Sequence, residues 1–179
     1  MEVLEIIALV FFVVIAAALF ITIRRTNRLV AGPREADGFR DAVADIANRT
    51  QVSLDLVAGR IDQVRRQTLD PGLIVEDVAS TRAAVHGYAE EAAALQVPGG
   101  SESIREALLG ELGRAERALE SVEHGSTLLA AAGHELAASE GQISIKRGYL
   151  NVLHVREAVQ KQAAAAGELA AQARRRPRM

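Results

Sequence analysis

The chain has 179 residues, a formal net charge of −2 and no cysteine. Hydrophobic residues make up 49% of it and aromatic residues only 3%, so the apolar content is mostly alanine, leucine, valine and isoleucine. This composition favours helices and predicts an all-α protein with one core. The absence of cysteine excludes disulfide bonds, thiolate metal sites and a cysteine nucleophile.

An uncharged apolar stretch of 18 residues lies near the N-terminus, at residues 6–23. At a rise of ~1.5 Å per residue it nearly covers the ~30 Å hydrocarbon core of a bilayer. A cleaved signal peptide is the alternative, because the small residues 16–18 suit a signal peptidase. Glu2 and Glu5 stand where a signal peptide carries lysine or arginine, however, and the apolar run continues past the alanines. The pattern therefore favours a retained single transmembrane anchor over residues 1–23.

The charges on the two sides of this stretch differ. Two glutamates precede it, and four arginines follow it: Arg24, Arg25, Arg28 and Arg34. Because positive charge stays on the cytoplasmic side, we expect a single-pass protein of the cell inner membrane with its N-terminus outside and its C-terminal domain cytoplasmic. Residues 24–33 form a basic juxtamembrane linker, residues 35–173 carry a net charge of −8, and the basic tail 174–179 carries +4. The lipid bilayer is thus an expected partner.

Residues 34–173 are predicted to form an antiparallel four-helix bundle with long helices, at about residues 34–69, 72–96, 103–123 and 127–173. Pro33 suits a first helical position, so the first helix is expected to begin near Arg34. Asp70-Pro71-Gly72 ends that helix, since Pro71 lacks an amide hydrogen and Asp70 can cap the next element. The first and last helices are the longest, so a long pair would carry a shorter hairpin.

The boundary between the last two helices has two possible positions. Ser103 and Glu106 form a possible capping box at the start of the third helix, and Gly125 offers a C-cap at its end. A second possible capping box, made by Ser139 and Gln142, places the break near Gly141 instead. The break near Gly125 is preferred because it matches the lengths of the outer helices, and the position near Gly141 stays open.

Apolar and small residues recur every three or four positions, which is typical of the packed seam of a helix. The first helix carries Phe39, Val43, Ile46, Thr50, Ser53, Val57, Ile61 and Val64 on this seam. The second carries Ile74, Val78, Thr81, Val85, Tyr88, Ala92 and Leu95, and the third carries Leu108, Leu112, Ala115, Leu119 and Val122. The last is expected to use Leu129, Leu136, Ile143, Tyr149, Val152 and Val159. Glu76 and Glu90 lie off the second seam.

Several short motifs of the chain match a known sequence pattern at the same spacing. Asn27-Arg28-Leu29-Val30 gives N-R-L-V after the membrane stretch, and residues 39–46 follow V-K-E-A-W-A-D-I. Further matches are Asp55-Leu56-Val57, Ile61-Asp62-Gln63-Val64, and Val78 with Arg82, Ala83 and Ala84. The C-terminal pattern E-L-x-x-T-E-N-R-I-x-x-x-R-x-x-Y-N is followed by Glu135, Leu136, Ser139, Glu140, Ile143, Arg147 and Asn151, with Tyr149 one place early. Over most of its length the chain therefore resembles the LemA family of bacterial membrane proteins.

The chain departs from the family pattern at identifiable positions. Val43 replaces a tryptophan, Val52 and Ser53 replace paired arginines, and the Tyr-Pro before the last helix is absent. The chain thus resembles a divergent LemA member. The resemblance implies one anchor helix, a helical bundle and a membrane location, and it implies no mechanism.

No motif for catalysis or cofactor binding occurs in the sequence. There is no Gly-rich phosphate loop and no G-x-S-x-G, and no histidine has a glutamate three residues earlier, as a di-iron bundle requires. His86 with Glu90 and Glu120 with His124 are spaced as exposed ion pairs. We therefore expect no enzyme, no catalytic, cofactor-binding or metal-binding residues, no cofactor and no small-molecule substrate.

Arg147, Tyr149 and Asn151 have the best claim to a special role. They would either bond across the bundle or recognise a partner, and the first is favoured because buried polar groups need partners inside the fold. The acidic body and its few aromatic residues predict no nucleic-acid binding.

The sequence thus predicts a membrane-anchored scaffold or protein-interaction component at the bacterial inner membrane. Its expected protein partner is another protein or a further copy of the chain. A cytoplasmic signalling module or an accessory subunit of a membrane complex is the alternative.

Overall fold

The computed structural model describes residues 2–131 and 135–175, and the side chains among these from Arg34 onward. This part of the chain contains α-helices, one short 3-10 helix and no strand, so the all-α prediction is confirmed. The elements are α1 (Glu2–Arg65), η1 (Pro71–Ile74), α2 (Val75–Ala94), α3 (Glu102–Ala130) and α4 (Glu135–Arg175).

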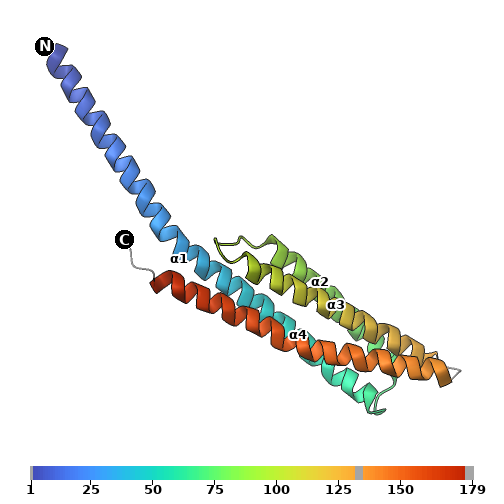
Figure 1. The fold of residues 1–179 in the computed structure, drawn as a ribbon. Coiled ribbons are helices and arrows are strands. Elements are labelled where there is room, and N and C mark those ends of the chain that lie inside the picture. The colour runs from blue at the N-terminus through green and yellow to red at the C-terminus, as the bar shows by residue number, and fades with distance from the viewer. Residues whose placement is uncertain (1, 132–134, 176–179) are drawn as a thin grey trace.

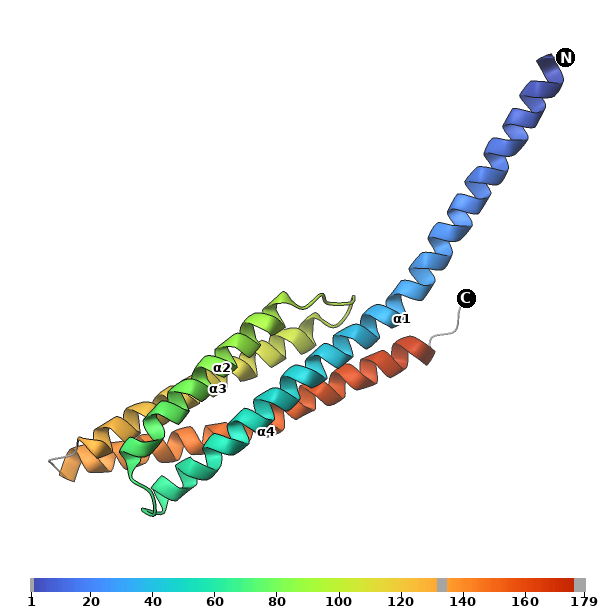
Figure 2. The ribbon, with the colours of Figure 1, turned by 180° about the vertical axis from the view of Figure 1, so that it is seen from behind.

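The four α-helices form an antiparallel bundle (Figure 1). Each helix packs beside the next one in the chain, and α4 packs beside α1 to close the ring. The view from behind shows the same arrangement, with the N-terminal part of α1 extending beyond the other helices (Figure 2). α1 and α4 are the longest helices, with 64 and 41 residues, so the prediction of a long pair that carries a shorter hairpin is confirmed.

Helix α1 is continuous through Gly32 and Pro33. The predicted helix start near Arg34 was therefore wrong, and the predicted linker over residues 24–33 lies within α1. Pro33 removes a single helical hydrogen bond and crowds the preceding turn, which bends a helix without necessarily ending it. The ribbon changes direction between its N-terminal part and the part within the bundle (Figure 1).

The membrane prediction concerns residues 6–23. Where the structure describes the side chains, no helix is both long enough and apolar enough to span a bilayer. Residues 6–23 lie outside those described side chains, so the transmembrane anchor stays a prediction.

The C-terminus of α1 is closed by two backbone hydrogen bonds. The N–H of Thr68 donates to the carbonyl of Gln63, and the N–H of Gln67 donates to that of Val64, each at 2.9 Å. This is the Schellman pattern, in which the residue after the helix adopts a left-handed conformation. Gln67 has a φ of 59°, although glycine is the usual residue there. α1 therefore ends at Arg65, four residues before the predicted end at Leu69.

The prediction that no helix continues through Asp70-Pro71-Gly72 is confirmed. A new element, η1, begins at Pro71, and Asp70 caps it by accepting a 2.7 Å hydrogen bond from the N–H of Gly72. The carboxylate thus takes the capping role that the sequence predicted.

The start of α3 differs from its prediction. Ser101 is the N-cap residue, and Ser103 lies within the helix, so the capping box of Ser103 and Glu106 was wrong. The loop is closed instead by Glu102, whose Oε2 accepts a 3.0 Å hydrogen bond from the N–H of Gly100. Gly100 has a φ of 90°, which glycine adopts without strain.

Both predicted positions for the last helix break were wrong. α3 runs through Gly125 to Ala130, and α4 begins at Glu135 and runs through Gly141. The two glycines face each other: a Cβ on Gly125 would lie 2.7 Å from the carbonyl oxygen of Gly141, and a Cβ on Gly141 would lie 2.9 Å from that of Gly125. They are glycines because the two backbones touch, not because a helix ends there.

The core follows the predicted seams in the first three helices. All the aliphatic residues predicted for α1 are buried, as are Val78, Val85 and Ala92 of α2 and the five residues predicted for α3. Tyr88 and Leu95 are half-buried against the core. Glu76 and Glu90 are exposed, as expected.

The seam of α4 differs from the prediction. Val152 and Val159 are buried as expected, but Leu136 is 87% exposed and Ile143 is 56% exposed. The residues that face the core near this end are Gly141, Ile145 and Gly148. Because glycines provide no hydrophobic signal, sequence reasoning placed the seam on the wrong face of this part of α4.

Candidate functional site

The three residues singled out from the sequence do not form a cluster. Arg147 and Asn151 are exposed, whereas Tyr149 is half-buried on a different face of α4. The guanidinium carbon of Arg65 lies 4.4 Å from the centre of the Tyr149 ring, a cation–π contact between α1 and α4. Tyr149 therefore has a packing role, and neither Arg147 nor Asn151 bonds across the bundle in the described part of the chain.

Of the two predicted histidine pairs, one is present. His86 Nε2 lies 3.8 Å from Glu90, and its Nδ1 lies 3.1 Å from Glu116 of α3. His124 and Glu120 are both exposed, and no ion pair joins them in the part of the chain that the structure describes. Within that part, no group of three or more His, Asp or Glu side chains is placed to hold a metal ion.

A pocket of about 660 Å³ opens at the end of the bundle that lies far from the N-terminus. We call it the end pocket. Its volume lies in the range of small-ligand sites. It is formed by the C-terminal turn of α1, the loop before η1, α3 and α4, and its lining residues are Val64, Arg65, Gln67, Thr68, Leu69, Asp70, Pro71, Leu129, Gln142, Ile145 and Lys146.

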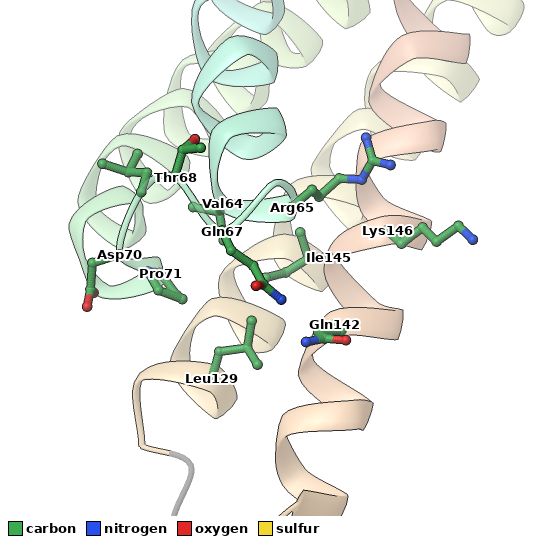
Figure 3. A pocket seen from close by; sticks show the side chains of 11 residues that line it. Val64, Arg65, Gln67, Thr68, Asp70, Pro71, Leu129, Gln142, Ile145 and Lys146 are labelled. Atoms are coloured by element: carbon green, nitrogen blue, oxygen red, sulfur yellow. The ribbon is translucent and has the colours of Figure 1, made fainter.

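The end pocket has an apolar floor and amide groups above it. Val64 and Ile145 are buried and, with Leu129, form the floor. Gln67 points its amide into the space between Ile145, Leu129 and Gln142 (Figure 3). An amide both donates and accepts hydrogen bonds, so the end pocket suits a small polar group carried on an apolar body.

The charged groups of the end pocket have partners or point away. Asp70 accepts the hydrogen bond from Gly72, and Arg65 donates to Asp62 at 2.8 Å. The ammonium of Lys146 points out of the pocket (Figure 3). This arrangement supports binding, and the lining residues include no paired nucleophile and base.

The second candidate site is a row of exposed apolar side chains on α4, which we call the outer stripe. It consists of Leu136, Ile143 and Leu150, which are 87%, 56% and 54% exposed. They are spaced by seven residues, so they share one face of the helix over ~21 Å at ~1.5 Å per residue. Large apolar side chains gathered on one exposed face are typical of an interaction surface.

Arginine ion pairs join α1 to its neighbours. The guanidinium of Arg49 bonds to Glu91 of α2, with 3.1 Å between Nη1 and Oε1, and lies 4.8 Å from the centre of the Tyr88 ring. This hydrogen bond lowers the pKa of Glu91 below its ordinary value, although partial burial works in the other direction. Other pairs between α1 and its neighbours are Arg60 with Asp77, Arg156 with Asp55, and Arg174 with Asp37.

The end pocket and the outer stripe were both missed by sequence reasoning. The pocket depends on the left-handed turn at Gln67, for which glutamine gives no signal. Of the outer stripe, Leu136 and Ile143 were predicted as core residues, and Leu150 was not predicted at all. No family model, curated protein or solved structure matches the chain.

Proposed function

We propose that the chain is a single-pass membrane-anchored bundle that acts as a scaffold or protein-interaction component at the bacterial inner membrane. The apolar stretch at residues 6–23 and the arginines after it support the anchor. The resemblance to the LemA family supports the same location. In this proposal the protein works by binding another protein and carries out no catalytic step.

The observation that carries the binding role is the outer stripe. Leu136, Ile143 and Leu150 expose large apolar surface to water on a well-formed helix. Covering such surface is favourable by ~25 cal/mol per Å². A membrane anchor would raise the local concentration of a partner in the same membrane, so a small interface suffices.

Capture of partners by the full chain in mild detergent tests this role. The variant Leu136→Ser, Ile143→Ser, Leu150→Ser should lose most stripe-dependent association, because it removes the apolar surface. The matched control is Val52→Ser, Leu56→Ser, Leu73→Ser, which removes three exposed apolar side chains elsewhere and should retain it. Equal capture by both variants would contradict the role of the outer stripe.

The topology is tested separately by thiol labelling, since the chain has no cysteine. Ser101 is fully buried, so the exposed Ser103 is the better reporter. Ser103→Cys should react with a membrane-impermeant maleimide only after lysis, whereas Glu2→Cys should react in intact cells. Labelling of Ser103→Cys without lysis would refute the cytoplasmic bundle.

The continuity of α1 favours a second candidate, a signalling module. A single helix from Glu2 to Arg65 can pass a rotation or a shift along its axis, which a flexible linker cannot. A flexible four-residue insertion between Gly32 and Pro33 separates the two roles. A scaffold keeps its partner association after the insertion, whereas a signalling module loses its response.

A further inference from the structure

The end pocket is bounded by elements that are packed against one another. The Schellman hydrogen bonds close the C-terminus of α1. η1 lies against the end of α3, since a Cβ on Gly72 would lie 3.8 Å from the Cβ of Ala130. Leu129 of α3 packs against α4, because a Cβ on Gly141 would lie 2.9 Å from its Cγ. A cavity whose walls are already in place needs little ordering when a ligand enters.

Two carboxamides from different parts of the fold stand over the apolar floor of the end pocket. Gln67 follows the end of α1, and Gln142 lies on α4. Figure 3 shows both side chains beside the space above Leu129 and Ile145. Both are exposed, and neither forms a side-chain hydrogen bond with the residues that the structure describes. Their donors and acceptors are therefore open to a ligand that also covers the apolar floor.

The charged side chains that line the end pocket offer no charge to a ligand. The carboxylate of Asp70 is held by a backbone N–H at 2.7 Å. The guanidinium of Arg65 bonds to Asp62 at 2.8 Å, and the ammonium of Lys146 points outward (Figure 3). An ionic head group on the floor would lose water without gaining a partner, which is costly.

The last carbonyls of α1 are occupied as well. That of Gln63 accepts hydrogen bonds from the N–H and the Oγ1 of Thr68, at 2.9 and 3.0 Å. That of Val64 accepts the N–H of Gln67 at 2.9 Å. A helix C-terminus favours cations through its free carbonyls, and these two are already used. A neutral head group therefore fits the end pocket better than a cation or an anion.

We propose that the end pocket binds an uncharged carboxamide carried on an apolar body. The amide N–H of the ligand donates to Oε1 of Gln67, and its carbonyl accepts from Nε2 of the same side chain, as two amides do when they pair. The apolar body covers Val64, Leu129 and Ile145, and Gln142 lies at its edge. The ligand is bound and not converted, because the lining residues include no paired nucleophile and base.

This site goes beyond the proposed function and is separate from the outer stripe. None of the three stripe residues lines the end pocket. Amide binding can thus fail while stripe-dependent capture of a partner stands, and the reverse also holds.

Small aromatic probes of similar shape test the head group: benzamide, acetophenone, benzoate and benzamidine. Acetophenone has a methyl group in place of the NH2 of benzamide, so it accepts hydrogen bonds but donates none. The readout is the δ1-methyl NMR signal of Ile145 in the full chain in mild detergent, with the exposed Ile143 as internal control. Benzamide should shift the signal of Ile145 and not that of Ile143. It should bind about 3- to 10-fold more tightly than acetophenone, and more tightly than either charged probe.

Variants of the glutamine test the amide pair. Gln67→Gly removes the carboxamide and relieves a left-handed backbone, so the chain stays folded. It should abolish the preference for benzamide over acetophenone, because only the apolar floor remains. Gln67→Asn keeps a carboxamide and tolerates a positive φ, so it should restore part of the preference. Gln172→Ala removes an exposed carboxamide near the other end of α4 and should bind like the natural chain.

Three outcomes would overturn the proposal. No change in the Ile145 signal with any probe would show that the end pocket takes no such ligand. Equal binding of benzamide and acetophenone by the natural chain would reduce it to an apolar cavity without amide recognition. Tighter binding of benzoate, lost in Lys146→Gln, would identify an anion site instead.

Discussion

The contact between α3 and α4 and the contact between α1 and α2 bury apolar surface with different kinds of residue. α3 and α4 touch through small residues, so that a Cβ on Gly148 would lie 2.6 Å from the carbonyl oxygen of Ala118. α1 and α2 contribute branched side chains such as Ile61 and Val85 to the core, and ion pairs such as the one between Arg49 and Glu91 join their edges.

This difference determines what each contact tolerates. Backbones that touch gain many dispersion contacts but leave no room for an added methyl group. Helices held by branched side chains leave a cavity when a side chain is shortened, and they are disrupted by a buried charge. The α3–α4 contact should therefore be sensitive to added volume, and the α1–α2 contact to lost volume or introduced charge.

The largest expected effect is that of a charge in the branched core. Val85→Asp should destabilise the fold by about 3–5 kcal/mol, because Val85 is fully buried and an aspartate there has no partner. Glu90→Gln, on the exposed face of the same helix, should change stability by less than ~0.5 kcal/mol. Thermal melts of the full chain in mild detergent, followed by circular dichroism, measure both, and equal effects would show that the core of α2 is misplaced.

The next effect tests the close contact. Gly148→Ala should destabilise by about 1–3 kcal/mol, because its Cβ would lie 2.5 Å from a methyl carbon of Val122 and α3 and α4 must separate. Gly167→Ala is the matched control on α4, since no atom lies within 4 Å of its Cβ. It should stabilise by up to ~1 kcal/mol, as alanine favours a helix more than glycine does. Opposite signs for the two changes support the close contact, and a stabilising Gly148→Ala would contradict it.

The glycines of the α3–α4 contact show what sequence reasoning could and could not recover. The seams of the first three helices were predicted because Val, Ile and Leu mark a buried face directly. Gly125 was interpreted as a C-cap, where glycine is common, and Gly141 as the position of an alternative break, since the role of a glycine in close packing depends on a neighbouring helix. That helix cannot be read from the local sequence.

The same limit applies to the candidate sites, because they too depend on elements that are distant in the sequence. Leu136 and Ile143 were predicted as core positions and Leu150 was not singled out, because an apolar pattern does not say whether a partner lies inside or outside the molecule. The end pocket depends on Gln67, a residue type that rarely adopts a positive φ. By contrast, the cap at Asp70 was predicted because its chemistry is local.

A smaller effect concerns that left-handed residue. Gln67→Gly should stabilise the fold by about 0.5–1 kcal/mol, because glycine adopts a φ of 59° without a steric cost. Gln63→Gly, within the regular part of α1, should destabilise by a similar amount. Melting temperatures of the two variants should therefore move in opposite directions, and a loss of stability in Gln67→Gly would show that the glutamine side chain contributes more than its backbone costs.

The smallest effect is the pH dependence of the exposed α1–α2 pair. The pKa of Glu91 is lowered below its ordinary value of 4.5, chiefly by the hydrogen bond from Arg49. The pair therefore stabilises the fold above that value, and its contribution is lost as the pH falls through the lowered pKa. The difference in melting temperature between the natural chain and Glu91→Gln should be constant near neutral pH and shrink below pH ~4.5. A difference that grows on acidification would have the wrong sign for this pair.

The pair between Arg174 and Asp37, with 2.6 Å between Nη2 and Oδ1, joins the last turn of α4 to the part of α1 that enters the bundle. The C-terminal turn of α4 thus lies at the end of the bundle from which the N-terminal part of α1 extends (Figure 1). A mechanical load that pulls these two parts apart acts on this pair first and then on each following contact between α1 and α4 in turn. We therefore expect the contacts between α1 and α4 to break one after another at low force, and Arg174→Ala should lower the force at which this opening begins.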